Sequence, residues 1–70
     1  MDQIQKKQLT EALVQAALLE SRDVAVHFAE IIAYLQKGNH LAALGTLQGT
    51  EEAFKFLGVA LSTAARLTQN

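Results

Sequence analysis

Residues 38–52 read GNHLAALGTLQGTEE and hold three of the four glycines in this 70-residue chain. The chain has no proline, and it shows no strand-like alternation bounded by turn signals, so we expect an all-α fold. The use of these glycines therefore decides how many helices form. Three uses compete: a turn between helices, a glycine-rich ligand cradle, or a surface where another backbone comes close.

Two positions in this stretch carry helix-end signals. Lys37-Gly38-Asn39 is the clearest stop, because a cation in the last turn followed by glycine at the left-handed position is a common C-terminal signature. Thr50-Glu51-Glu52 reads as an N-cap followed by two acids in the first turn of a last helix. If Gly49 ends a short helix over His40 to Leu47, the chain has four helices. If the glycines are tolerated at about 0.5–1 kcal/mol each, residues 40–68 form one long helix.

The ligand-cradle interpretation fails on the residues around the glycines. A phosphate loop needs a preceding strand and a lysine followed by Ser or Thr after its last glycine. Here Gly49 is followed by Thr-Glu-Glu, and the two acids would repel a phosphate. Gly45 and Gly49 have the spacing that lets helix backbones approach closely. Gly45 has no capping role, so we expect it to pack closely against another helix.

The N-terminal half predicts two helices separated by the polar run Glu20–Asp23, with a kink in one helix as the alternative, since Ser, Arg and Asp are tolerated inside helices. The first helix is expected from about Asp2 to Leu19, and the second from about Arg22 to Lys37, with Ser21 as its N-cap. The apolar spacing of each helix predicts one buried face. These faces are Leu9, Ala12, Leu13, Ala16 and Ala17 in the first helix, Val24, Phe28, Ile31, Ile32 and Leu35 in the second, and Ala53, Phe54, Leu57, Ala60, Leu61 and Ala64 in the last.

These segments predict a single helical domain over residues 1–70. The expected fold is a small all-α bundle of three or four helices, with an antiparallel helical hairpin as its main unit. A chain this short buries only about 60% of its unfolded surface, and it has no cysteine with which to form disulfides. Half of its residues are hydrophobic, and the mean hydropathy is +0.13. We therefore expect the chain to complete its core by self-association or by docking on a partner helix.

The partner surface is predicted from apolar residues that fall off the face their own helix needs for a monomer core. Phe56 is the expected anchor, because aromatic side chains bury a large area at interfaces. Replacing both Phe56 and Val59 with aspartate is expected to dissociate the assembly or abolish partner binding. The full predicted partner-binding set is Val14, Leu18, Phe56, Val59 and Leu67.

Composition argues against most other functions. The net charge is −1 with only six basic residues, which are scattered along the chain, so nucleic acid is not an expected partner. No apolar run approaches the roughly 20 residues that span a bilayer, and the polar N-terminus lacks a signal-peptide layout. The expected location is therefore cytoplasmic, without membrane insertion.

The titratable residues do not form a recognisable site. Asp23 and His27 are four residues apart on one predicted helix, so a carboxylate could orient an imidazole. No oxyanion loop accompanies Ser21 as a nucleophile, and the repeated Glu-x-x-His of di-metal bundles is absent. His27 is interpreted as a surface or interface histidine. We expect no catalysis, metal, cofactor or small-molecule ligand.

From Tyr34 onwards, a helix, a glycine-containing turn and a last helix rich in Ala and Leu follow one another. The residues that carry this pattern are Leu35, Gly38, Leu57, Ala60, Leu61 and Ala64. The pattern resembles the small helical-hairpin co-chaperones of type III secretion needle proteins. The resemblance implies a cytoplasmic protein that holds a partner chaperone, which in turn holds an export subunit. The alternative is a small regulatory or inhibitor protein, phage or antitoxin-like, that binds a protein target.

Overall fold

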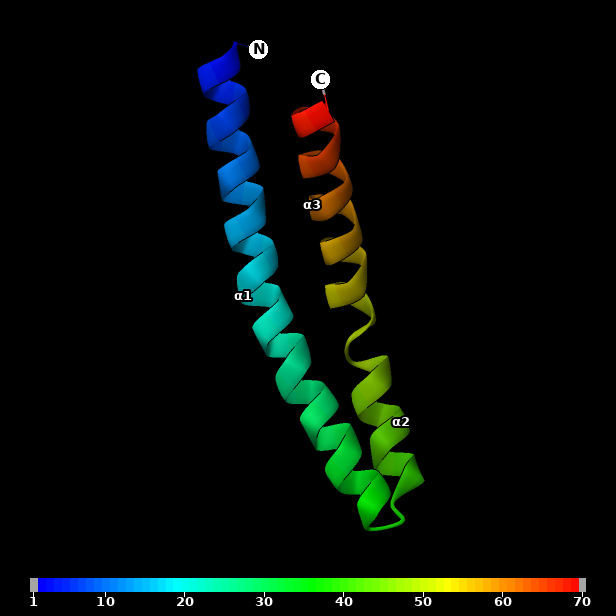
Figure 1. Ribbon diagram of the computed structural model, residues 1–70. Coiled ribbons are helices and arrows are strands. Elements are labelled where there is room, and N and C mark those ends of the chain that lie inside the picture. The colour runs from blue at the N-terminus through cyan, green and yellow to red at the C-terminus, as the bar shows by residue number, and fades with distance from the viewer. Residues whose placement is uncertain (1, 70) are drawn as a thin grey trace.

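The computed structural model describes residues 2–69, which form three α-helices and no strand. Helix α1 spans Gln3–Gln36, α2 spans His40–Gln48 and α3 spans Glu51–Gln69. Figure 1 shows α1 as one arm of an antiparallel hairpin, with α2 and α3 following each other along the second arm. Helix α1 packs against both α2 and α3. The predicted all-α class is confirmed.

Helix α1 is continuous over 34 residues, so the predicted break at Glu20–Asp23 is wrong. The hydroxyl of Ser21 donates to the Ala17 carbonyl at 2.6 Å, a bond that serine makes inside a helix and not at an N-cap. The two predicted helices over residues 2–19 and 22–37 are therefore one helix. At about 1.5 Å per residue its length is about 51 Å, which sets the length of the molecule.

Helix α1 begins at the position that the sequence indicated, with Asp2 as its N-cap. The Asp2 carboxylate accepts from the Gln5 amide at 2.7 Å, and the Gln5 side chain accepts from the Asp2 amide at 3.3 Å. This reciprocal pair is a capping box, which satisfies two amides that no helical carbonyl can reach. The polar first turn is thus explained by local hydrogen bonding.

The predicted stop at Lys37-Gly38-Asn39 is confirmed in detail. Gly38 has a φ of 75°, the left-handed conformation that glycine adopts without steric cost. The Asn39 amide donates to the Tyr34 carbonyl at 2.8 Å and the Gly38 amide to the Leu35 carbonyl at 3.0 Å, which is the Schellman arrangement. The Asn39 side chain then accepts from the Ala42 amide at 3.2 Å and caps α2.

Of the two alternatives for residues 40–68, the structure has the one with a break near Gly49, but Thr50 does not act as predicted. The Thr50 carbonyl accepts from the Phe54 amide at 3.0 Å, so Thr50 occupies the N-cap position of α3. Its hydroxyl donates backwards to the Leu47 carbonyl at 2.6 Å, and no amide of the described part of α3 donates to it. The Thr50 side chain is fully buried, and its bond to Leu47 joins the two helices across the break.

Gly45 does not pack closely against another helix of this chain. A Cβ built on Gly45 would meet no atom within 4 Å outside its own helical backbone. The close approach predicted at this residue is therefore wrong within residues 2–69. Gly45 lies in the middle of α2 with no backbone or packing reason to be glycine in the monomer.

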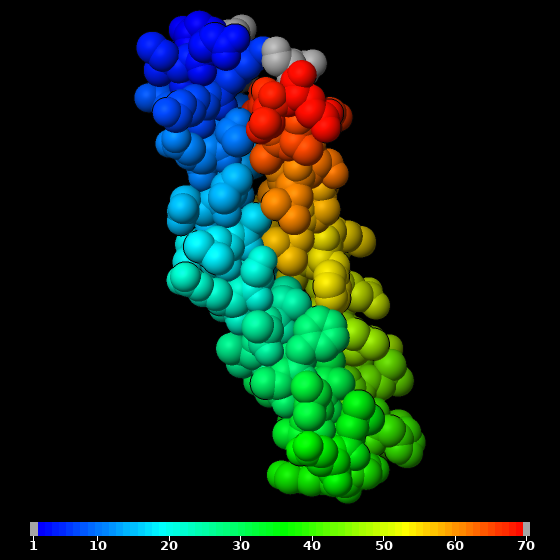
Figure 2. Space-filling view, viewed as in Figure 1, coloured from blue at the N-terminus to red at the C-terminus, as the bar shows by residue number. Residues whose placement is uncertain are grey.

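The molecule is a rod that is only two helices thick. Its extents are 53 × 15 × 14 Å and its radius of gyration is 16.0 Å, whereas a compact chain of this length has a radius of about 11 Å. Figure 2 shows the two arms lying against each other along most of the rod. The helical hairpin is thus formed, while a bundle with its own central core is not formed by one copy.

We predict opposite effects of alanine at the two glycines discussed above. Gly38→Ala should lower the free energy of unfolding by about 1–2 kcal/mol, because alanine must adopt a positive φ. Gly45→Ala should raise it by about 0.5–1 kcal/mol, because alanine is the better helix former and has open space. Denaturant titrations followed by circular dichroism, at one protein concentration, measure both. A loss of stability in Gly45→Ala would contradict the placement of this glycine.

Candidate protein-interaction surface

The two arms meet along a seam with regular spacing. On α1 the seam positions are three and four residues apart in strict alternation, and the same alternation follows the second arm. Spacing of this kind, with a mean of 3.5 residues, is typical of left-handed coiled coils. All of the following positions are buried or half-buried: Lys6, Thr10, Leu13, Ala17, Glu20, Val24, His27, Ile31 and Tyr34 on α1, and Ala43, Thr46, Thr50, Ala53, Leu57, Ala60, Ala64 and Leu67 on α2 and α3.

The seam keeps its register through the break between α2 and α3. Thr46 belongs to α2, Thr50 lies in the break, and Ala53 belongs to α3. Their spacing of four and then three residues continues the alternation on both sides. Because the register is kept, α2 and α3 present the same side to α1 and act as one arm.

The most buried seam residues are small. Ala17, Val24, Ala43, Ala60 and Ala64 are between 3% and 8% exposed. Small side chains let the two arms approach closely, but each buries little apolar area. The predicted buried faces are therefore confirmed for Leu13, Val24, Ile31 and Leu57, which are buried or half-buried. They are wrong for six other large members, since Leu9, Phe28, Ile32, Leu35, Phe54 and Leu61 are between 38% and 56% exposed.

The exposed apolar side chains give the protein an unusually large surface. Sixteen large hydrophobic residues of the described chain are between 38% and 71% exposed. The accessible surface is 5215 Å², about 900 Å² more than the roughly 4300 Å² expected for a compact monomer of this mass. The excess follows from the rod shape of the hairpin, which leaves many of its large apolar side chains in contact with solvent.

Nine of these residues form what we call the continuous face, which lies along one side of the seam and draws on both arms. On α1 it occupies the helical positions 14, 18, 21, 25, 28, 32 and 35, all of them apolar or small. On the second arm it occupies positions 44, 47, 51, 54, 58, 61 and 65, of which only Glu51 is charged. Its large members are Val14, Leu18, Phe28, Ile32, Leu35, Leu44, Leu47, Phe54 and Leu61.

An aromatic pair joins the two halves of the continuous face. The rings of Phe28 on α1 and Phe54 on α3 lie edge to face, with centroids 6.0 Å apart and planes at 71°. This geometry is favourable for aromatic rings. Both rings remain 40% and 45% exposed respectively, so the pair forms part of the surface. The contact shows that the two apolar stripes lie on the same side of the hairpin.

The opposite side of the seam is also partly apolar, and we call it the interrupted face. Its large residues are Leu9, Leu19, Val26, Phe56 and Val59. Charged residues stand between them at helical spacing, namely Asp23, Glu30, Glu52 and Arg66. The Glu52 carboxylate lies 3.6 Å from the Lys55 ammonium, and both side chains are well exposed, so this pair contributes little to stability.

The five residues predicted to bind a partner do not lie on one surface. Val14 and Leu18 are 46% and 41% exposed and belong to the continuous face. Phe56 and Val59 are 44% and 68% exposed and belong to the interrupted face. Leu67 is half-buried in the seam, so it does not fall off the face that α3 needs against α1. The prediction of a partner surface remains, but its residues divide between two faces.

Sequence reasoning missed most of the continuous face because it assigned Phe28, Ile32, Leu35, Phe54 and Leu61 to the monomer core. Each of these apolar residues lies next to a seam position in the sequence. The seam and its neighbouring stripe therefore look like one broad apolar face, which the sequence pattern predicts to be buried as a whole. The spacing in the second arm does not separate the two stripes, because positions 44, 47, 51, 54, 58, 61 and 65 alternate by three and four residues just as the seam positions do.

His27 is a polar residue inside the seam. Its ring is half-buried, and Nδ1 is fully buried with no hydrogen-bond partner among the described residues. The carboxylate of Asp23, one turn earlier, therefore does not orient this ring through Nδ1. A buried nitrogen without a partner destabilises the fold, so His27 is a structural weakness of the hairpin as a monomer.

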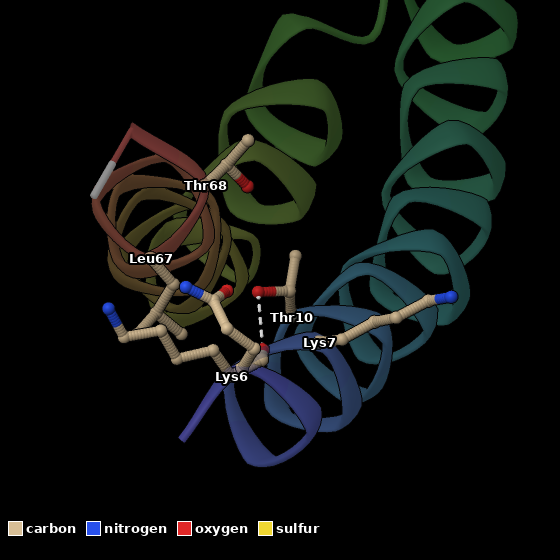
Figure 3. A pocket seen from close by; sticks show the side chains of 6 residues that line it. Lys6, Lys7, Thr10, Leu67 and Thr68 are labelled. Carbon is tan, nitrogen blue, oxygen red and sulfur yellow. Dashed lines mark hydrogen bonds between the residues drawn. The ribbon is translucent and has the colours of Figure 1, made fainter. Parts of the chain in front are cut away.

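A small open pocket lies where the two chain ends meet. Figure 3 shows Lys6, Lys7 and Thr10 on α1 together with Leu67 and Thr68 at the end of α3. Gln3 completes the lining, and the volume is about 220 Å³. The Thr10 hydroxyl is already bonded to the Lys6 carbonyl at 2.8 Å. The pocket offers two cations and no buried polar group aimed into it.

The described residues offer no metal centre or membrane span. No three His, Asp, Glu or Cys side chains within residues 2–69 lie close enough to hold a metal ion. No helix over the same residues combines the length and apolar character that crossing a membrane requires. The apolar faces are therefore the main surface features of the described chain.

Comparison with known proteins gives no relative for this chain. No protein-family model, curated protein or solved structure matches it. The candidate site is consequently defined by the geometry of the two apolar faces.

We predict that His27→Leu stabilises the protein. The substitution removes the unpartnered nitrogen and adds apolar contact in the seam, so the free energy of unfolding should rise by about 1–3 kcal/mol. Denaturant titration at fixed protein concentration measures the change. His27→Gln keeps a polar group at the same position and should bring no such gain. Equal or lower stability in His27→Leu would mean that the ring is satisfied by a group outside the described chain.

Proposed function

We propose that this protein is a non-enzymatic protein-protein interaction module, which completes its hydrophobic core by oligomerising or by docking on a partner. The observation that carries the proposal is the inverted distribution of side chains in the hairpin. Alanine and threonine fill most of the seam of the second arm, whereas large apolar residues of both arms remain exposed. A chain that places its largest apolar side chains outside its own seam gains most of its hydrophobic burial from another chain.

The two faces fit two kinds of contact. The continuous face is uncharged along α1 and suits an extensive, mainly apolar interface. The interrupted face mixes Phe56 and Val59 with charged residues, as the polar rim and apolar anchors of a selective interface do. One hairpin can therefore assemble through one face and recognise a protein through the other.

The biological role depends on which protein the hairpin binds. The resemblance of residues 34–70 to co-chaperones of type III secretion needle proteins supports a secretion co-chaperone in the cytoplasm that holds a partner chaperone. A small regulatory protein that inhibits a protein target, as phage or antitoxin-like proteins do, is the alternative. Both roles use the same apolar faces, and neither requires catalysis, nucleic acid or a cofactor. Secretion genes, phage genes or a toxin gene beside this one would separate the two roles.

We predict that Phe56→Asp combined with Val59→Asp abolishes partner capture. Two carboxylates on the interrupted face would have to lose their hydration on binding, which costs several kcal/mol unless they are paired. The measurement is a pull-down from the native host with the full chain immobilised, in which captured proteins are identified by mass spectrometry. A protein bound by the wild type should be absent from the variant.

The matched control is Gln15→Glu combined with Gln48→Glu. Both glutamines are exposed on the polar side of their helices, so two added carboxylates there should leave capture unchanged. Circular dichroism should show the same helix content in all three proteins. Capture of the same partner by Phe56→Asp/Val59→Asp would remove the interrupted face from the proposal.

A further inference from the structure

We infer that the continuous face is covered by a second copy of this chain, so that two hairpins pack face to face as a four-helix bundle. This inference deepens the proposed function by assigning one of the two faces to self-association. It rests on the width of the face, its charge pattern and the area that pairing would bury.

The width of the face calls for an occupant that is itself two helices wide. The large residues of the continuous face are contributed by α1 on one arm and by α2 and α3 on the other. The Phe28 and Phe54 rings, 6.0 Å apart, bridge the arms above the seam. Both rings are 40–45% exposed, so the occupant of this face must cover residues of both arms. Another hairpin covers both stripes at once, and a copy of this chain has the same width and length.

The charge pattern allows this face to meet itself. An isologous interface places equal patches opposite each other, so a face with several like charges would repel its copy. From Val14 to Leu35 the α1 stripe carries no charge. On the second arm Glu51 lies on the outer edge of the stripe, in the first turn of α3, where the helix dipole favours a carboxylate.

The interrupted face does not meet this condition. It carries three acids, Asp23, Glu30 and Glu52, against Arg66 and the exposed Lys55 that pairs with Glu52. Two copies joined through this face would bring six carboxylates together with two guanidinium and two ammonium groups. Self-association is therefore assigned to the continuous face, and the interrupted face is left for a partner of different sequence.

The area that pairing would bury fits a stable homodimer. Two separate copies expose twice 5215 Å², whereas a compact protein of twice the mass exposes about 7100 Å². Association into a compact bundle would thus remove about 3300 Å², which lies within the roughly 2000–5000 Å² of obligate homodimers. The aromatic pair lies near the middle of the apolar stripe, where the strongest contacts of an interface are usually found.

The test is the solution mass of the full-length chain, measured by analytical ultracentrifugation at about 5 and about 100 μM. The wild type should have twice the chain mass of 7.6 kDa. Leu18→Glu combined with Ile32→Glu places two carboxylates in the continuous face and should return the mass to that of one chain. The matched control is Leu19→Glu combined with Val26→Glu, on the same helix and at comparable exposure, which should keep the doubled mass.

The second measurement is the unfolding midpoint of the wild type and of the control, which can be determined even if Leu18→Glu/Ile32→Glu does not fold. If the wild type is a dimer, its unfolding midpoint in denaturant should rise with protein concentration, and so should that of the control. A single-chain mass for the wild type, with a midpoint independent of concentration, would overturn the inference. A doubled mass that is lost in the control but kept in Leu18→Glu/Ile32→Glu would overturn it as well. Either result leaves partner capture through Phe56 and Val59 to be judged by the pull-down.

Discussion

The close packing of small side chains along the seam is the constraint on which the rest of the structure depends. Ala43, Ala60 and Ala64 are nearly fully buried against α1, and no larger side chain would fit between arms at that separation without moving them apart. Because most inner positions of the second arm are small, many large apolar residues of both arms lie beside the seam and remain exposed. The shape of the molecule and its exposed apolar faces both follow from this one choice of residues.

The seam also explains why a break in the second arm does not divide the hairpin. Thr50 is fully buried at a seam position, and its hydroxyl and amide both bond to the Leu47 carbonyl. The break therefore adds no change of register, and α3 continues the contact with α1 that α2 begins. A kink at this point can adjust the direction of the arm while the same side of each helix stays inward.

A hairpin of this kind has a weak interior and a strongly apolar exterior. Its seam includes Glu20 and Lys6 as half-buried charged residues, together with a histidine nitrogen that lacks a partner. These residues contribute little to the burial that stabilises a fold. The continuous face, with its aromatic pair, holds nine of the sixteen large exposed hydrophobic residues of the described chain. In the proposed function, stability and interaction are linked, because the apolar surface that one hairpin leaves exposed is the surface that another chain covers.

The sequence by itself determined the features that local hydrogen bonding and backbone sterics control. These are the all-α class, the turn at Gly38 and the excess of apolar residues, whereas one helix or two over residues 40–68 remained open until the structure showed the break. It failed at Glu20–Asp23, because a polar run inside a helix resembles a helix end until the helix is seen to continue. Only the tertiary structure decided which apolar stripe faces inward. Two neighbouring apolar stripes on one helix exchange places when the helix rotates about its axis by a fraction of a turn. Which stripe faces inward depends on the opposite arm, because small residues let the two arms pack more closely than large ones do.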